Sequence, residues 1–280
     1  MNNPEHIQRN ELAAEHVPRP APVKEAPDWR RFDVALARHG DHIAEGLTFA
    51  TEHRTRIDEG TARHIAHVLG RSLGQDSALS YFARTGSGNY ALLREEYLSL
   101  HNDSGVSGTT QELIDWLGDY LIRVHHPDAQ TITAEESYPP RLDNILVPTT
   151  LAVSGISALV HIPGIYGTND IEELKEELDN LSLAEDPGLQ GFLALPDANA
   201  MSGDIMEDFH QRYVGTWRQK EDAITELCLL DDREEEVQDF AAERKLYFDY
   251  LTPDYEALQE EIEETFYLVE KGGRAYVFSK

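Results

Sequence analysis

Hydrophobic residues in the first half of the chain recur at the spacing of an α-helix. Spacings of 3, 1, 3 and 1 put one apolar stripe on a single helical face, formed by Leu113, Trp116, Leu117, Tyr120 and Leu121. Earlier stripes are formed by Phe32, Leu36, Ile43 and Leu47, by Ile65, Val68 and Leu69, and by Leu92, Leu93, Tyr97 and Leu100. The pattern predicts a helical domain over residues 29–124.

The second half contains strand patterns as well. Residues 149–162 are apolar and β-branched around a Ser-Gly turn, and residues 189–195 form a short apolar run between a glycine and a proline. Both segments are predicted to be strands. Residues 266–279, with Gly272 and Gly273 in the middle, are predicted to form a closing β-hairpin.

Helices are expected between these strands. Asn169, followed three residues later by Glu172, has the spacing of a capping box. Pro253 favours a helix with proline in its first position. Two further helices are expected around residues 204–213 and 219–229. The order of elements predicts an α+β fold, in which a helical amino-terminal domain precedes an acidic domain of mixed helices and strands.

Composition divides the chain into an arm, two domains and a linker. Residues 1–28 are polar and rich in proline, and we expect them to form a mobile arm. Residues 125–148 interrupt the periodicity with several prolines and are predicted to link the helical domain to an acidic domain over residues 149–280.

Acidic residues outnumber basic residues and are concentrated in the second half. The 280 residues include 24 Lys and Arg against 52 Asp and Glu, a formal net charge of −28. Residues 1–140 carry a net charge of −8 and residues 141–280 carry −20. Adaptation to high salt predicts an even spread of acid, and direct nucleic-acid binding requires basic residues that neutralise phosphates. The charge distribution argues against both.

The sequence favours a cytoplasmic protein without a membrane segment. No run approaches the roughly 18 apolar residues of a membrane-spanning helix, and residues 1–30 lack the apolar core of a secretory signal. Cys228 is the single cysteine, so no intramolecular disulfide can form. We expect Cys228 to act as a small buried hydrophobic residue.

Recognisable catalytic and metal-binding motifs are absent from the sequence. It has no Gly-rich phosphate loop, no G-x-S-x-G motif, and no C-x-x-C or H-E-x-x-H signature. His64 with His67 and His125 with His126 form pairs, but no third ligand follows at a recognisable spacing. We expect no cofactor, metal site or catalytic residue. A cytosolic DNA-processing or hydrolytic enzyme of an unrecognised family stays an alternative, as does an acidic module that binds a basic protein.

Two predicted helices of the second half carry like charges a helical turn apart. Pairs such as Glu172 with Glu176 and Glu256 with Glu260 each cost about 0.2–0.5 kcal/mol, so the pattern does not serve stability. Duplex DNA carries about one charge per 1.7 Å of axis, so the 20 net charges of the second half match roughly 34 Å of duplex. The pattern favours a DNA mimic over an ordinary solvated helix face.

The candidate partner-binding residues are the acids of these two helices and of the acidic run between them. They are Asp170, Glu172, Glu173, Glu176, Glu177, Asp179, Asp231, Asp232, Glu234, Glu235, Glu236, Asp254, Glu256, Glu260, Glu261, Glu263 and Glu264.

Short motifs in residues 149–280 resemble the antirestriction protein ArdA family. An F-x-x-x-Y-x-G-x-W pattern followed by an acidic helix is formed by Phe209, Tyr213, Gly215 and Trp217 with Glu221 and Asp222. A Y-F-D-Y motif is formed by Tyr247, Phe248, Asp249 and Tyr250, and a closing strand by Ala275, Tyr276, Val277 and Phe278. No family resemblance covers the first half.

The resemblance implies an elongated α+β homodimer that inhibits a type I restriction-modification enzyme by occupying its DNA-binding cleft. The partner would be a DNA-binding protein of a host defence system rather than a nucleic acid, and the mimicry would be spread over many acids without a catalytic centre. We expect the motif aromatics Phe209, Tyr213 and Trp217 to pack in the core rather than to contact the partner.

Overall fold

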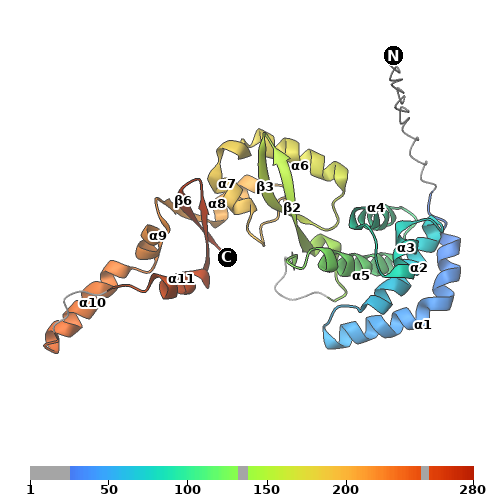
Figure 1. Ribbon diagram of the computed structural model, residues 1–280, viewed down its shortest axis with the longest axis horizontal. Helices are drawn as coiled ribbons and strands as arrows, with labels where there is room; N and C mark the ends of the chain where they lie inside the picture. Colours follow the sequence, from blue (N-terminus) through green and yellow to red (C-terminus); the bar gives the residue numbers. More distant parts are fainter. Residues whose placement is uncertain (1–25, 132–137, 247–251) are drawn as a thin grey trace, which may run out of the picture.

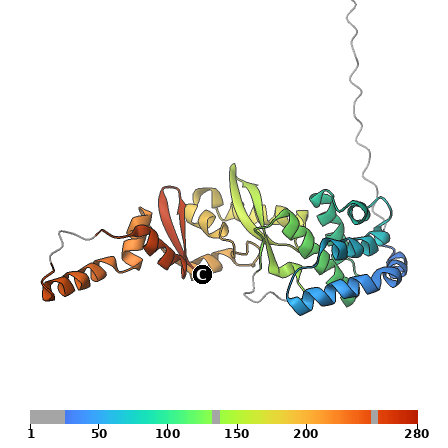
Figure 2. The same cartoon turned by 60° about the horizontal axis from the view of Figure 1, so that its bottom comes forward.

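The computed structural model describes residues 26–131, 138–246 and 252–280. These residues form an elongated molecule with a helical region at one end, a β-hairpin in the middle and a projecting helix at the other end (Figure 1, Figure 2). The predicted α+β fold class is confirmed, because a helical amino-terminal region precedes mixed helices and two small antiparallel sheets. Among the described residues, no helix is both long and apolar enough to cross a membrane.

The helical region lies at the amino-terminal end of the described chain. Its helices are α1 (Trp29–His53), α2 (Glu59–Leu73), α3 (Ala78–Thr85), α4 (Tyr90–His101) and α5 (Gly108–His125).

Polar side chains determine where these helices begin. Asp58, Ser77 and Asn89 each accept a hydrogen bond from the backbone N–H three residues further on, at 2.7, 3.0 and 3.3 Å. Each bond satisfies a donor that has no partner within its own helix. Glu96 on α4 accepts the first two N–H groups of α3, at 2.8 and 2.9 Å, and so joins two helices.

The predicted apolar stripes meet in the first of the hydrophobic cores. Leu93, Leu117 and Leu121 are fully buried there. Leu92, expected in the same stripe, is 53% exposed. One step along a helix turns the side chain by about 100°, so the neighbours Leu92 and Leu93 cannot both face the core.

The central hairpin follows the helical region. It is built from β2 (Ile145–Val153) and β3 (Ile156–Pro163), with β1 (Gln130–Thr131) on the outer edge of β2 and the short 3-10 helix η1 (Leu142–Asn144) before it. Ser154 and Gly155 form the turn with φ values of 44° and 85°, the pair of positive angles that a tight hairpin turn needs. The prediction of strand structure around this turn is confirmed.

The hairpin contributes to two hydrophobic cores. Ile145 and Val147 pack with the helical region, whereas Leu151 and Val153, further along the same strand, pack with the region after it. Leu142, within the segment predicted as a linker, also belongs to the first core. Residues 138–148 therefore contribute side chains to the core of the helical region.

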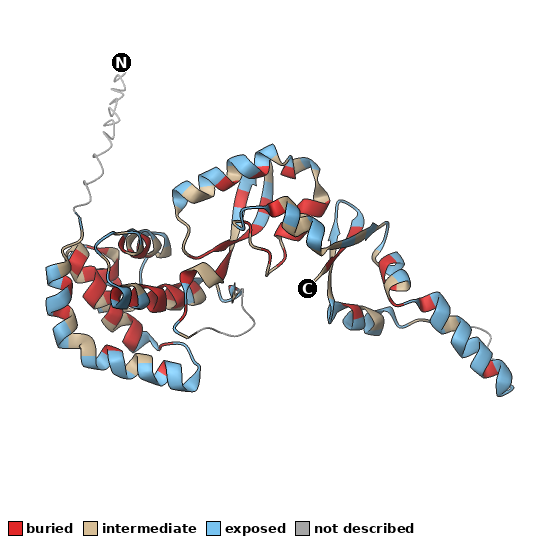
Figure 3. Ribbon diagram, turned by 180° about the vertical axis from the view of Figure 1, so that it is seen from behind, coloured by how far each residue is buried: buried red, intermediate tan, exposed pale blue. Residues whose placement is uncertain are grey.

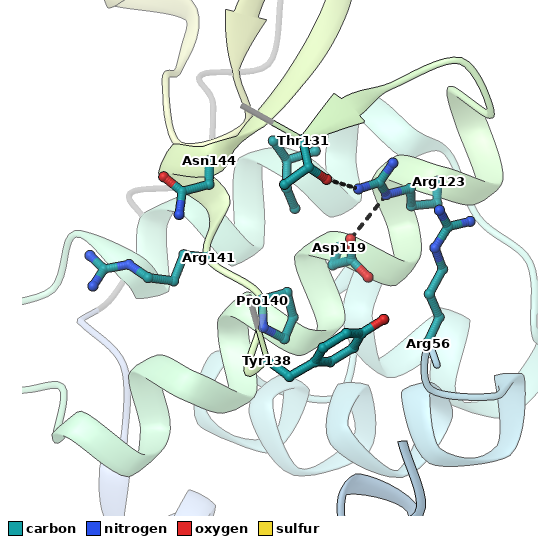
Figure 4. A pocket seen from close by; sticks show the side chains of 9 residues that line it. Arg56, Asp119, Arg123, Thr131, Tyr138, Pro140, Arg141 and Asn144 are labelled. Carbon is teal, nitrogen blue, oxygen red and sulfur yellow. Dashed lines mark hydrogen bonds and ion pairs between the residues drawn. The ribbon is translucent and has the colours of Figure 1, made fainter. Parts of the chain in front are cut away.

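Arg123 ties the start of the first sheet to α5 (Figure 4). Its Nε donates to Asp119 Oδ1 at 3.1 Å, and its guanidinium also donates to Thr131 Oγ1 at 2.8 Å and to the carbonyl of Ala129. Both side chains of the ion pair are about nine-tenths buried. Breaking such a pair leaves a buried charge without compensation, so this contact fixes β1 on the helical region.

The remaining elements build the second region. They are α6 (Thr168–Asn180), η2 (Leu183–Glu185), α7 (Pro187–Leu193), α8 (Ile205–Arg212), β4 (Tyr213–Trp217), α9 (Lys220–Leu227), α10 (Leu230–Glu243), α11 (Tyr255–Glu263), β5 (Phe266–Lys271) and β6 (Arg274–Ser279).

The second sheet has the strand order β4-β6-β5. The predicted closing hairpin is confirmed, with Lys271 opposite Arg274 on either side of the Gly-Gly turn. Phe209 and Tyr213 stack with ring centroids 5.3 Å apart and pack on buried Phe278, as expected of core aromatics. Trp217 is half-buried at the end of β4.

The prediction of a strand over residues 189–195 is wrong. Most of this segment lies in α7, where Asp186 accepts the N–H of Leu189 at 3.0 Å and Pro187 occupies the first turn. An aspartate cap followed by proline is a helix start, and this local signal outweighs the apolar run that follows.

Two predicted helix starts are displaced. Gly167, rather than Asn169, precedes α6, and the side chain of Asp170 accepts its N–H at 2.6 Å. Pro253 lies before α11 rather than in its first position, because Asp254 accepts the N–H of Ala257 and caps the helix. In both places the residue whose carboxylate reaches a free N–H determines the start.

Burial falls along the molecule from the helical region toward α10 (Figure 3). The last core is small, with Ile224, Cys228 and Ile262 as its buried members. Cys228 is buried as expected, and burial raises the pKa of its thiol. Parts of three predictions lie outside the described residues. These are residues 1–25 of the predicted arm, residues 132–137 of the predicted linker and the whole Y-F-D-Y motif at residues 247–250.

Candidate acidic interaction surface

The acids predicted from the sequence lie on α6, α10 and α11 and at the ends of α11. We call them together the acidic surface. Helix α6 carries Asp170, Glu172, Glu173, Glu176, Glu177 and Asp179; α10 carries Asp231, Asp232, Glu234, Glu235 and Glu236; α11 and its ends carry Asp254, Glu256, Glu260, Glu261, Glu263 and Glu264. All of them are exposed except Asp170 and Glu234, which are half-buried.

A few of these carboxylates hold the local structure together. Asp170 and Asp254 accept backbone N–H groups at helix starts, at 2.6 and 3.2 Å. Asp179 at the end of α6 accepts the hydroxyl of Ser154 in the hairpin turn. The role of these groups in the fold limits their freedom to contact a partner.

Two members form ion pairs with nearby cations. Lys175 Nζ lies 2.7 Å from Glu172 on α6. Arg233 on α10 forks across both carboxylate oxygens of Glu261 on α11, at 3.1 and 2.6 Å. The Arg233 hydrogen bond holds the pKa of Glu261 below its usual range. Because these pairs are exposed, they orient the helices but add little stability.

Glu263 accepts a hydrogen bond from the side-chain amide of Gln259. The side chains of the other members form no hydrogen bond or ion pair with any described residue. They are Glu173, Glu176, Glu177, Asp231, Asp232, Glu234, Glu235, Glu236, Glu256, Glu260 and Glu264. Exposed carboxylates without a partner in the fold are free to bind cationic groups of another molecule.

The sequence prediction omitted acids that lie beside this surface. Asp222 and Glu226 on α9 line a pocket of about 440 Å³ together with Asp231, Asp232 and the ring of Trp217. Trp217 Nε1 donates to Glu226 at 2.8 Å. The signal was present in the sequence, because the acidic helix after the Phe209–Trp217 motif contains these acids.

Apolar side chains are exposed on the projecting helix. Val237 and Phe240, one helical turn apart on α10, are 41% and 52% exposed, and Leu229 just before the helix is 62% exposed. Arg244 lies 5.1 Å from the centre of the Phe240 ring. Helix α10 therefore offers acids and apolar groups to solvent at the same time.

A different constellation lies between α4, α5 and η1. His101 Nε2 is 3.8 Å from Asp115 Oδ1, which accepts the backbone N–H of Leu142 at 3.3 Å. Burial raises the pKa of Asp115 to about 6, and burial lowers the pKa of His101. The raised pKa of Asp115 and the lowered pKa of His101 both disfavour an ion pair between them. The distance of 3.8 Å between His101 Nε2 and Asp115 Oδ1 is too long for a hydrogen bond.

This pair lines a pocket of about 630 Å³. Gln111, whose buried Nε2 has no partner among the described residues, also lines it, as do Glu112 and Arg141. No serine, threonine or cysteine is among the described residues that line the pocket. The side chains present, which include His101, Asp115 and Glu112, can take part in proton transfer and polar binding.

Comparison with known proteins gives no match. No protein-family model, curated protein or solved structure matches this chain.

Proposed function

We propose that this protein is a DNA mimic that inhibits a type I restriction-modification enzyme by occupying the cleft in which that enzyme binds duplex DNA. The acidic surface supplies the mimicry, and the resemblance to the ArdA family supplies the class of enzyme. The protein acts without a cofactor and does not bind nucleic acid itself.

The linear charge density of the acidic helices carries this proposal. Helix α10 has seven carboxylates and one guanidinium in 14 residues, a net charge of −6. At a rise of about 1.5 Å per residue, this is about one net charge per 3.5 Å. Helix α6 has a net charge of −5 over 13 residues, which is about one net charge per 3.9 Å. Helix α11 has a net charge of −4 over 9 residues, which is about one net charge per 3.4 Å. One strand of duplex DNA carries about one charge per 3.4 Å.

The placement of the helices supports the same function. Helices α6, α11 and α10 follow one another from the middle of the molecule to its far end, so acids extend along an elongated body (Figure 1). A generic acidic patch for a basic protein needs no such extension. A DNA-binding cleft is lined by cations along its length, and an extended row of acids can contact many of them together.

The exposed apolar residues of α10 support assembly with a second copy. Val237 and Phe240 are 41% and 52% exposed one helical turn apart, and a symmetric contact between two copies buries such groups in pairs. A homodimer would double the length of the acidic surface.

Displacement of DNA from the target enzyme tests the function. Wild-type protein is titrated against a type I restriction-modification enzyme bound to labelled duplex, over a range of salt concentrations. We expect displacement in which the logarithm of the affinity falls linearly with the logarithm of the salt concentration. Inhibition that does not depend on salt contradicts the proposal.

A matched pair of variants distinguishes the acidic surface from net charge alone. Changing Glu172, Glu173, Glu176 and Glu177 on α6 to Gln should weaken displacement strongly. Changing the exposed acids Asp33, Asp41, Glu45 and Glu52 on α1 to their amides removes the same charge and should leave displacement nearly unchanged. Equal loss in both variants contradicts a specific role for the acidic surface.

The pocket at His101 and Asp115 favours a second candidate function, that of a hydrolytic enzyme. Two titratable groups converge in one concave site, which is the arrangement that general acid and base chemistry requires. A panel of chromogenic ester, phosphoester and glycoside substrates tests it. Turnover by wild-type protein that is lost in Asp115→Asn supports an enzyme, and absence of turnover across the panel removes this candidate.

A further inference from the structure

A pocket at one end of the helical region has the opposite charge to the rest of the protein. It lies between the beginning of α1 and the end of α2 and measures about 460 Å³. The described residues that line it are Arg30, Arg31, Val34, Ala35, Arg38, His39, His67 and Arg71. Four guanidinium groups and two imidazoles thus converge, with no carboxylate among these lining residues.

The antiparallel packing of α1 on α2 builds this pocket. The backbone N–H of Asp28, before α1, donates to the carbonyl of Ser72 in the last turn of α2 at 2.9 Å, which joins the two helix ends. Arg71 of α2 is thereby brought beside the arginines of α1. One turn further in, the rings of His39 and His67 approach with centroids 4.6 Å apart.

Three of the four arginines form no ion pair with another residue that the structure describes. Arg31 pairs with Asp28 at 3.0 Å. Arg30, Arg38 and Arg71 form no ion pair with any described residue. The chain has more than twice as many acids as basic residues, so a cluster of four arginines is not a consequence of composition. Like charges held together destabilise the fold, and an anion bound from solution would relieve that repulsion.

The imidazoles add hydrogen-bonding ring nitrogens beside the arginines. Burial is the main cause that lowers the pKa of His67. Repulsion from the neighbouring groups His39, Arg71 and His64 lowers it further. Burial, and then repulsion from His39 and His42, likewise lowers the pKa of His64. The Nδ1 atom of His64 lies 3.3 Å from Nδ1 of His39. Among the described residues, no group of three or more His, Cys, Asp or Glu is arranged to hold a metal ion. The cluster therefore presents guanidinium charge together with imidazole rings, of which His67 has a lowered pKa.

Size and charge define the ligand. A guanidinium group matches a phosphate in a two-point hydrogen bond, and several guanidiniums together need more than one anionic group. The volume of about 460 Å³ is that of a small-molecule site. Duplex DNA is not expected as the occupant, because the net charge of −28 of the whole protein repels it at distances greater than the size of the pocket.

We propose that this pocket binds a small anion with two or more phosphate groups, of the nucleoside diphosphate class. Arg38 and Arg71, on different helices, hold the phosphates between them. The ligand thereby links the start of α1 to the end of α2.

Calorimetric titration of the full-length protein with ADP and, separately, with inorganic pyrophosphate tests the proposal. We expect saturable binding of one ligand per chain and an increase in the melting temperature. The double variant Arg38→Gln, Arg71→Gln should bind about tenfold more weakly or worse, while Arg218→Gln, an exposed arginine of the acidic half, should bind like the wild type. Tighter binding of ADP than of pyrophosphate assigns part of the pocket to the nucleoside.

A second readout separates binding from a structural effect. The imidazole proton resonances of His67 should shift on titration with pyrophosphate, and a nearby phosphate should raise the pKa of that ring. Arg38→Lys, which keeps the charge but loses the fork, should bind with intermediate affinity and melt like the wild type.

Specific results overturn the proposal. These are no saturable binding of either ligand, equal weakening in Arg218→Gln, or arginine-dependent self-association or DNA binding in place of small-anion binding. The pocket and the acidic surface share no residue, so failure of one proposal is distinguishable from failure of the other.

Discussion

Several carboxylates in the helical region stabilise the fold, whereas most carboxylates of the acidic surface form no hydrogen bond or ion pair with a described residue. Glu96 caps α3 at 2.8 and 2.9 Å, and Asp119 pairs with buried Arg123 at 3.1 Å. On α10, Asp231, Glu235 and Glu236 are exposed and form no hydrogen bond or ion pair with a described residue. The same residue types therefore contribute stability at one end of the molecule and an uncompensated negative potential at the other.

The hydrophobic cores differ in the same direction. The core of the helical region buries side chains from every helix of that region, whereas the core nearest α10 has Ile224, Cys228 and Ile262 as its buried members. A small core contributes little free energy, so α9, α10 and α11 should be the first elements to unfold locally. Repulsion among neighbouring acids adds to this tendency.

The largest effect is expected from truncation in the helical core. Leu117→Ala should lower the free energy of unfolding by about 2–5 kcal/mol, because Leu117 is fully buried and the truncation leaves a cavity. Leu92→Ala removes the same atoms from a side chain that is 53% exposed and should cost far less. Urea unfolding of both variants measures the difference, and equal losses would contradict the packing described for α4 and α5.

Removal of the buried Asp115 charge should stabilise the protein at high pH. The pKa of Asp115 is raised from 3.8 to about 6, so the folded state binds the proton more tightly than the unfolded state. Stability therefore falls as the pH rises from about 4 to about 6, by at most about 3 kcal/mol, and stays lower above that range. The variant Asp115→Asn keeps an oxygen that can accept the backbone N–H of Leu142. Because asparagine does not ionise, this variant lacks the loss of stability at higher pH.

Melting curves at two pH values measure the effect of Asp115→Asn. The variant should melt higher than the wild type at pH 8 and close to it at pH 4, as the shift in the pKa requires. Asp76→Asn, an exposed aspartate between α2 and α3, is the control and should change neither temperature. A difference that is larger at the acidic pH would reverse the sign and contradict the assignment.

Matched Glu→Gln changes compare the two regions directly. Glu96→Gln should lower the free energy of unfolding by about 1 kcal/mol, since the amide has a single acceptor oxygen for the two N–H groups of α3. Glu176→Gln on α6 should have almost no effect on unfolding, and as one of many acids it should barely alter displacement of DNA. Abolition of inhibition by Glu176→Gln alone would favour a discrete active site over a distributed surface.

A change of at most about 1 kcal/mol is expected from reversing one charge on α11. Glu260 lies one turn from Glu256, Glu263 and Glu264, so Glu260→Lys exchanges three repulsive pairs for attractive ones. We expect a gain of about 0.5–1 kcal/mol in the free energy of unfolding together with weaker displacement of DNA. Parallel unfolding and displacement assays measure both. A loss of stability in Glu260→Lys would contradict the repulsion among these acids.

Local patterns in the sequence were sufficient for several features of this protein. Helical spacing of apolar residues predicted the helical region, and turn residues predicted both the hairpin at Ser154 and the hairpin at Gly272. Charge distribution predicted where exposed acids gather, because charged residues are rarely buried without a partner. These features depend on residues within about one or two turns of each other.

Features that depend on distant partners came from the tertiary structure alone. Strand β4 exists because β6, far along the chain, pairs with it. The arginine pocket exists because α1 and α2 pack antiparallel, which brings Arg38 and Arg71 together. The division of β2 between two cores, with Val147 on one side and Leu151 on the other, likewise requires both bodies to be in place. A pattern in the sequence indicates the local conformational preference of a segment. Which segments meet is decided only in the folded chain, because burial and hydrogen bonds between distant residues form only when those segments pack together.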